Sequence, residues 1–214
     1  LRLRLKASLD NGWGQFVQPV ARIEGSGEPE KFILLGGHFD AWGVGATDNA
    51  TNNAQLMELA RVLQSHRGKL RRSVVIALWS GHETGMMEGS TWYLDKYWDN
   101  VNRNCIMYIG IGSHALKGAT DFVVESSPES ADFARQMSAK MLNIPDQKIN
   151  PMRRVGDQSF FGVGVPSLAT NFEHPIEVKK EWNGASLGWW YHSDADTLDK
   201  VDYDLVRKGM EITA

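Results

Sequence analysis

The chain has 214 residues, and 23 basic against 26 acidic side chains give it a formal net charge of −3. Hydrophobic residues make up 42% and charged residues 23% of the sequence, which is typical of a folded globular domain and excludes intrinsic disorder as its main state. The near-neutral charge argues against a nucleic-acid-binding protein, and no apolar run approaches the roughly 20 residues that span a bilayer.

The first half of the chain alternates strand and helix patterns. Residues 1–6 alternate leucine with arginine or lysine, and residues 16–23 also alternate, so both segments predict strands. Residues 32–35 predict a short apolar strand that ends in two glycines. Apolar residues recur at helical spacing in residues 53–64, which predicts an amphipathic helix. The β-branched run of residues 73–79 predicts a strand covered on both faces.

The second half continues the alternation. We expect helices over residues 90–97, 131–142 and 203–212, and strands over residues 106–111, 122–124 and 165–170. This order predicts a three-layer α/β/α fold with a central, mostly parallel mixed sheet. No repeat or linker divides the chain, so we expect a single domain over residues 1–214. The chain begins within a strand pattern, without a signal peptide, and ends within a helix pattern, which indicates a segment of a longer protein.

Imidazoles and carboxylates stand at the junctions of these predicted elements. Those that follow a strand or precede a helix are His38, Asp40, Asp48, His82, Glu83 and His192. Ligand sites of parallel sheets form at the carboxyl ends of the strands, so we expect these side chains to converge. A single cysteine, Cys105, excludes a thiolate zinc cluster, and any metal ion must be held by histidine and carboxylate. Such a set fits a hydrolytic zinc site, which needs about three protein ligands, a water and a base.

Short motifs around these residues stand in a fixed order. They are Gly36-Gly37-His38-Phe39-Asp40, Gly45-Ala46-Thr47-Asp48-Asn49-Ala50, Leu78-Trp79-Ser80-Gly81-His82-Glu83-Thr84-Gly85, Gly156-Asp157-Gln158-Ser159-Phe160-Phe161 and Tyr191-His192-Ser193. Together they resemble the di-zinc metallopeptidases of the zinc aminopeptidase and glutamate carboxypeptidase family, which includes glutaminyl cyclase and transferrin receptor relatives. The resemblance runs from about residue 17 to the end of the chain.

The resemblance implies a role for each residue of the predicted metal site. It implies that Asp48 bridges two metal ions and that His38 binds the first ion, with Asp40 behind it. It implies that Glu83 and His192 bind the second ion. Zinc is the expected cofactor, and a small peptide or amide is the expected substrate.

Other residues have weaker assignments. The resemblance places Asp157 in a loop that lines the substrate site, although a role in a turn is an equal alternative. Tyr191, Trp189 and Trp190 precede His192 and either wall a pocket or belong to the core, and we favour the pocket wall. Trp42 is expected at the rim of the site.

Two positions depart from the family pattern. His82 stands where the family has a glutamate that acts as the general base. Gly112 stands where the family has an aspartate ligand of the first ion. Because glycine has no donor atom, the first ion would keep only two ligands, whereas all three ligands of the second ion are present. We therefore expect one zinc ion, with two ions as the alternative.

The replacement at His82 leaves three interpretations open. A neutral imidazole could serve as the general base, because histidine titrates close to neutral pH. Alternatively the base has been lost and His82 has no catalytic role. In the third interpretation, His82 or His114 helps to bind the first ion.

The leading hypothesis is a metal-dependent hydrolase of peptide or related amide bonds, of aminopeptidase or carboxypeptidase type. A catalytically inactive binding module on the same fold is one alternative, since a base and a ligand are both replaced. Single-zinc amide chemistry such as glutaminyl cyclisation is another. By resemblance the protein is expected to be secreted or periplasmic, and whether it forms a homo-oligomer is left open.

Overall fold

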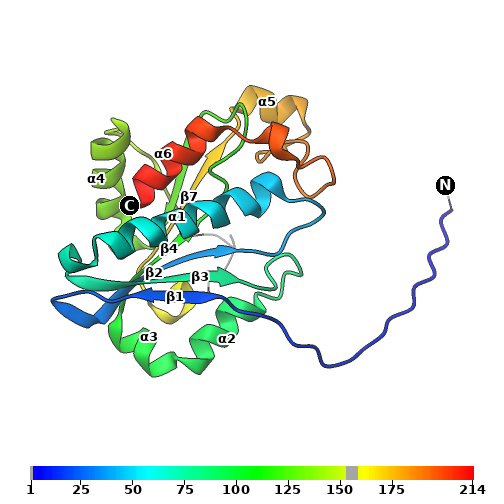
Figure 1. Ribbon diagram of the computed structural model, residues 1–214. Coiled ribbons are helices and arrows are strands. Elements are labelled where there is room, and N and C mark those ends of the chain that lie inside the picture. The colour runs from blue at the N-terminus through cyan, green and yellow to red at the C-terminus, as the bar shows by residue number, and fades with distance from the viewer. Residues whose placement is uncertain (1, 153–158) are drawn as a thin grey trace.

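A mixed sheet lies at the centre of the protein, for which the computed structural model describes residues 2–152 and 159–214 (Figure 1). The strands of the described residues follow the order β1-β3-β2-β4-β7-β5-β6 across the sheet. They are β1 (Val20–Ile23), β2 (Glu28–His38), β3 (Arg72–Trp79), β4 (Cys105–Ile111), β5 (Asp121–Ser126), β6 (Ile149–Pro151) and β7 (Ser167–Glu173).

The central strands run parallel, and antiparallel pairs stand further out. β2 pairs in parallel with β3 and β4, and β4 pairs in parallel with β7. β1 is antiparallel to β3 and β5 is antiparallel to β7, while β6 is parallel to β5. This arrangement confirms the predicted mostly parallel mixed sheet. The parallel centre brings the carboxyl ends of β2, β3, β4 and β7 to one edge of the sheet.

Helices cover both faces of this sheet (Figure 1). On one face lie α1 (Thr51–Ser65), α4 (Ala131–Leu142) and α6 (Tyr203–Thr213), and α6 contacts both α1 and α4. On the other face lie α2 (Glu88–Lys96) and α3 (Trp98–Asn104). The short helix α5 (Ile176–Glu181) follows β7. The three-layer α/β/α fold is therefore confirmed.

Alternating strand residues separate the two hydrophobic cores. Leu34 of β2 packs with the α2 and α3 residues on one face, whereas its neighbour Leu35 packs with the leucines of α1 on the other. Both side chains are buried, with at most 3% exposed. At about 25 cal/mol per Å² of apolar surface, each such leucine contributes roughly 2 kcal/mol to folding. The apolar run predicted for β3 is likewise covered on both faces.

Several local predictions need correction. The strand predicted for residues 1–6 is wrong, since residues 2–19 have no ladder partner and Leu3 and Leu5 are 87% and 93% exposed. Alternation alone makes a strand only where a neighbouring backbone offers hydrogen bonds. The described structure also holds α3, α5 and β6, which the sequence pattern did not predict. None of the described helices combines the length and the apolar character that a membrane crossing requires.

Candidate metal centre

His38 is the last residue of β2 and reaches the carboxyl edge of the sheet. Two residues earlier, the β2 backbone lies against the indole of Trp79, because a Cβ on Gly36 would lie 2.2 Å from Trp79 Nε1. The His38 Nδ1–H donates to the carbonyl oxygen of Asp40 at 2.9 Å, so the other ring nitrogen carries no proton in the neutral ring. That nitrogen, Nε2, lies 3.1 Å from Asp48 Oδ1. Two acceptors that face each other in this way require a proton or a cation between them.

Asp48 lies in the turn Ala46–Ala50, just before α1. Its carboxylate is buried, and its backbone is held by a second buried carboxylate, that of Asp196. Asp196 accepts hydrogen bonds from the backbone N–H of Asp48 at 3.1 Å and of Thr47 at 2.9 Å. Asn49, in the same turn, donates its Nδ2 to the carbonyl oxygen of His38 at 2.7 Å. The turn is therefore fixed both to β2 and to the loop that precedes α6.

Glu83 and His192 approach the other oxygen of Asp48. His192 Nε2 lies 3.2 Å from Asp48 Oδ2 and 3.1 Å from Glu83 Oε2. Asp40 positions this part of the site by accepting the backbone N–H of Glu83 at 2.9 Å. His192 has a left-handed backbone with a φ of 60°, which is rare outside glycine and is maintained only where the surroundings impose it.

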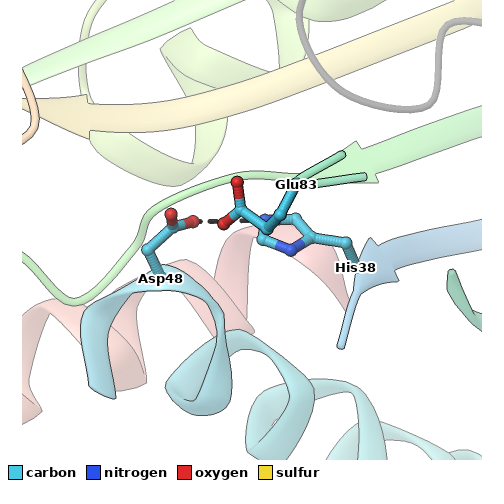
Figure 2. Close-up of side chains that lie close together, drawn as sticks. All are labelled: His38, Asp48 and Glu83. Atoms are coloured by element: carbon cyan, nitrogen blue, oxygen red, sulfur yellow. Dashed lines mark hydrogen bonds and ion pairs between the residues drawn. The ribbon is translucent and has the colours of Figure 1, made fainter. Parts of the chain in front are cut away.

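Figure 2 shows the side chains of His38, Asp48 and Glu83 pointing toward one another from three separate elements. One ligand atom from each of the three lies within 4.8 Å of the others. A zinc ion with tetrahedral bonds near 2.0 Å separates its ligand atoms by about 3.3 Å, close to the distances seen here. Among the described residues, Asp48 Oδ2 and Glu83 Oε1 are buried and accept no hydrogen bond. The donor set therefore fits a divalent cation.

The pKa values of the site are shifted in the directions expected where negative charges are crowded together. The pKa of Glu83 is raised to about 7 by burial and then by the negative charge of Asp48. Burial alone would lower the pKa of His38, but the hydrogen bond and the charge of Asp48 raise it above its ordinary value. The pKa of Tyr191 is also raised, by burial and then by the charge of Asp48. Without a cation, the site thus retains protons near neutral pH to offset its crowded negative charge.

Two aromatic stacks enclose the histidines. The ring of His82 lies parallel to that of His38, with an interplanar angle of 6° and 3.9 Å between the ring centroids. The ring of Tyr191 stacks on His192 with 3.8 Å between the centroids. Both His82 and Tyr191 line the cavity beside the metal centre. The structure thus brings His82 next to the predicted ligands, against one face of His38.

A cavity of about 350 Å³ extends from these residues along the sheet. Its floor is a row of small residues on three adjacent strands, because Gly36 pairs with Gly110 and Gly110 pairs with Ala169. Gly112 and Asn171 line the same cavity, at the level of His38. A larger cavity of about 720 Å³ beside α2 is lined, among the described residues, by no histidine or carboxylate, so it offers no comparable chemistry.

Some predicted residues lie elsewhere. Trp190 is 4% exposed and belongs to the core, which corrects its assignment to the pocket wall. Trp189 and Trp42 are more than half exposed, and Trp42 stands at the rim with 6.4 Å between its ring centroid and that of His192. Asp157 lies outside the described residues. His114 is fully buried, and its Nε2 lies 3.0 Å from the carbonyl oxygen of Thr170, so it faces β7 and α6.

Sequence reasoning missed two residues of the site. No role was predicted for Asp196, because its position in the loop before α6 gives no local indication that it holds the Asp48 turn. Asn171 carried no motif at all. Its side chain enters the site because β7 lies beside β4, a pairing between residues 59 positions apart that no local pattern reveals.

Comparison with known proteins is consistent with this geometry. Residues 19–214 match the family described as peptidase family M28. The chain therefore belongs to peptidase family M28. The family comprises hydrolases of the metallopeptidase type, in agreement with the resemblance found in the sequence.

Each match includes a large share of this chain but a smaller share of the relative. It is 30% identical over 207 residues to the aminopeptidase NAALADL1 of Rattus norvegicus, a match of 84% of this chain and 27% of that protein. It is 33% identical over 109 residues to transferrin receptor protein 2 of Homo sapiens, covering 50% of this chain and 13% of that one. The zinc aminopeptidase BSAP of Bacillus subtilis has the same fold, with a TM-score of 0.76 and 16% identity. That match covers 92% of this chain and 48% of BSAP. The chain thus spans about a quarter of the length of NAALADL1 and less of that of transferrin receptor protein 2.

Proposed function

We propose that this protein is a zinc-dependent hydrolase of peptide or related amide bonds, acting through a single ion held by Asp48, Glu83 and His192. One observation carries the proposal. The Nε2 atom of His192 lies within 3.2 Å of Asp48 Oδ2 and of Glu83 Oε2, and Asp48 Oδ2 and Glu83 Oε1 are buried and accept no hydrogen bond from the described residues. Buried carboxylates without donors are costly unless a cation compensates them.

A zinc ion held by these three residues would polarise the scissile carbonyl and would lower the pKa of a bound water. The residues of the chain supply the remaining functions. His82 lies against His38 at the cavity wall, where a neutral imidazole takes the proton of the attacking water and passes it to the leaving amine. Asp40 and Asp196 hold the backbone of Glu83 and Asp48, so that the ligand geometry is in place before substrate arrives.

The direct test measures metal content and activity together. The purified protein is expected to hold zinc and to release the N-terminal residue from aminoacyl or dipeptide substrates. A chelator and the variant His192→Ala should each abolish both properties. His66→Ala is the matched control, since the His66 side chain is exposed and lies within hydrogen-bond distance of Ser65 and Val62 of α1, far along the chain from the proposed ligands. A protein that holds zinc but leaves all such substrates intact would contradict the hydrolase assignment.

The role of His82 makes a separate prediction. In His82→Phe the aromatic stack on His38 is kept and the ring nitrogens are lost. General acid–base catalysis contributes about 10²- to 10⁴-fold, so kcat should fall by that range while the zinc content stays constant. Steady-state kinetics and metal analysis of the same preparation check this. An active His82→Phe variant would show that His82 is not the base.

A second candidate function is single-zinc amide chemistry such as the cyclisation of an N-terminal glutaminyl residue. The observation that favours it is the ligand set itself, in which one imidazole and two carboxylates converge without a glutamate at the base position. Incubation with a glutaminyl peptide discriminates the two. Loss of ammonia with a cyclic product supports cyclisation, whereas release of free glutamine supports hydrolysis.

A further inference from the structure

We propose that Asn171 limits the site to one metal ion, because its carboxamide fills the space that a side chain on residue 112 would need. The inference rests on the proposed metallopeptidase function and adds a determinant of the ion count. It concerns the half of the site where Asp48 Oδ1 faces His38, on the other side of the Asp48 carboxylate from His192.

The strands place three residues side by side at this half of the site. Gly36 pairs with Gly110, and Gly110 pairs with Ala169, on three adjacent strands. Two positions further along stand His38 in β2, Asn171 in β7 and Gly112, which directly follows β4 and still donates its backbone N–H to Thr170. All three are on the same face because side chains alternate with a period of two. Neighbouring strands are about 4.8 Å apart, so a ligand carried by residue 112 would stand directly beside His38.

The side chain of Asn171 occupies that space. A Cβ on Gly112 would lie 1.7 Å from Asn171 Oδ1 and 2.6 Å from its Cγ. The backbone oxygen of Thr170 would lie 2.9 Å from the same Cβ. Contacts below 3.0 Å require something to move, and the carboxamide is the part that can. Any ligand introduced at residue 112 therefore competes with Asn171.

Asn171 is also held in this position. Its Oδ1 accepts the backbone N–H of Ser113 at 2.8 Å, so rotation of the carboxamide would remove the acceptor of a buried donor. A neutral carboxamide is a poor substitute for the carboxylate, imidazole and thiolate groups that bind zinc. While Glu83 binds the ion that it shares with His192, the described residues offer a second ion in this half only His38 and one oxygen of Asp48, fewer than the three ligands that zinc sites require.

The experiment compares zinc content by atomic emission after dialysis against excess zinc. The protein itself, Asn171→Ala, and Gly112→Ala with Asn171→Ala should each hold one ion per chain. Gly112→Asp alone should hold no second ion and should melt at a lower temperature. Gly112→Asp combined with Asn171→Ala should hold two ions and should recover part of the lost melting temperature, and the combination with Asn171→Ser should behave alike.

Two ions in Gly112→Asp alone would overturn the inference, because Asn171 would then not exclude the ligand. One ion in the folded double variants would also overturn it, and so would double variants that melt no higher than Gly112→Asp or fail to fold. A protein that holds no zinc before any substitution would instead contradict the proposed function, which separates the two failures.

Discussion

Asp196 shows how much of the candidate metal centre depends on a residue outside the proposed ligand set. This carboxylate is 1% exposed and accepts three hydrogen bonds, from both backbone N–H groups of Thr47 and Asp48 and from the Thr47 hydroxyl. It thereby sets the direction in which the Asp48 side chain projects. Residues that hold a metal ligand in place commonly change metal affinity by about one to two orders of magnitude when they are replaced.

Asp196→Asn is expected to weaken zinc binding by about 10- to 100-fold. The carboxamide nitrogen cannot accept a hydrogen bond, so one buried backbone donor loses its partner, at a cost of about 1–3 kcal/mol. Asp199→Asn is the matched control, since Asp199 lies three residues on with a side chain that is 65% exposed. Zinc titration and thermal unfolding of both variants check the prediction. Equal zinc affinity in the two variants would contradict it.

Glu83 gives the metal-free protein a pH-dependent stability. Its pKa is raised from 4.5 to about 7, by burial and then by the charge of Asp48. An acid with a raised folded-state pKa binds more protons when folded, so its contribution to stability is complete below about 4.5 and is lost as the pH rises through about 7. With a chelator present, Glu83→Gln should therefore melt higher than the parent at pH 8 and about equally at pH 5. A difference in melting temperature that is largest at pH 5 would contradict the raised pKa of Glu83.

At the scale of elements, long periodic segments were predictable and short ones were not. The range predicted for α4 is the range observed, and the predicted β3 differs by one residue. β6 has 3 residues, α5 has 6 and α3 has 7, too few for a hydrophobic period to appear. Convergence of His38, Glu83 and Asp48 was predictable because parallel strands share one carboxyl edge. Asn171 was not, since its position depends on the order of β4 and β7 in space.

The packing of α6 yields a prediction that reverses the usual helix rule. Alanine normally stabilises a helix relative to glycine by about 1 kcal/mol. In α6, however, a Cβ on Gly209 would lie 2.5 Å from Nδ1 of the buried His114 ring. Gly209→Ala should therefore lower stability by about 1–3 kcal/mol through overpacking. Gly68→Ala is the control, since nothing lies within 4 Å of its Cβ, and urea unfolding measures both. A stable Gly209→Ala would place α6 further from His114.

At the scale of the whole molecule, residues 2–19 divide into an unattached and an attached part. Leu3, Leu5, Leu9 and Trp13 are each more than 80% exposed. Gln18, by contrast, donates its Nε2 to the carbonyl oxygen of Leu78 at 2.6 Å and accepts the backbone N–H of Ser80 at 3.2 Å. The folded domain therefore gains contacts only from the later part of this segment.

Deletion of residues 1–12 should change the melting temperature by no more than about 2 °C, because surface changes away from contacts cost under about 0.5 kcal/mol. Deletion of residues 1–19 should lower it further, since the hydrogen bonds of Gln18 to β3 and its flanking loop are lost. Differential scanning calorimetry of the two shortened chains tests this. Equal melting temperatures would mean that Gln18 adds nothing to stability.

The two glycines in the floor of the cavity differ in whether they can be replaced by a larger residue, which affects how substrate selectivity could diverge among relatives of this chain. At Gly36 a methyl group would collide with the indole of Trp79, so this position cannot accept a larger residue. At Gly110 the nearest atom, on Tyr108, would be 3.5 Å from a new Cβ, an ordinary contact. A single codon change at Gly110 can therefore make the cavity shallower without disturbing the ligands of the proposed metal site. Selectivity on this scaffold can thus evolve separately from the metal centre.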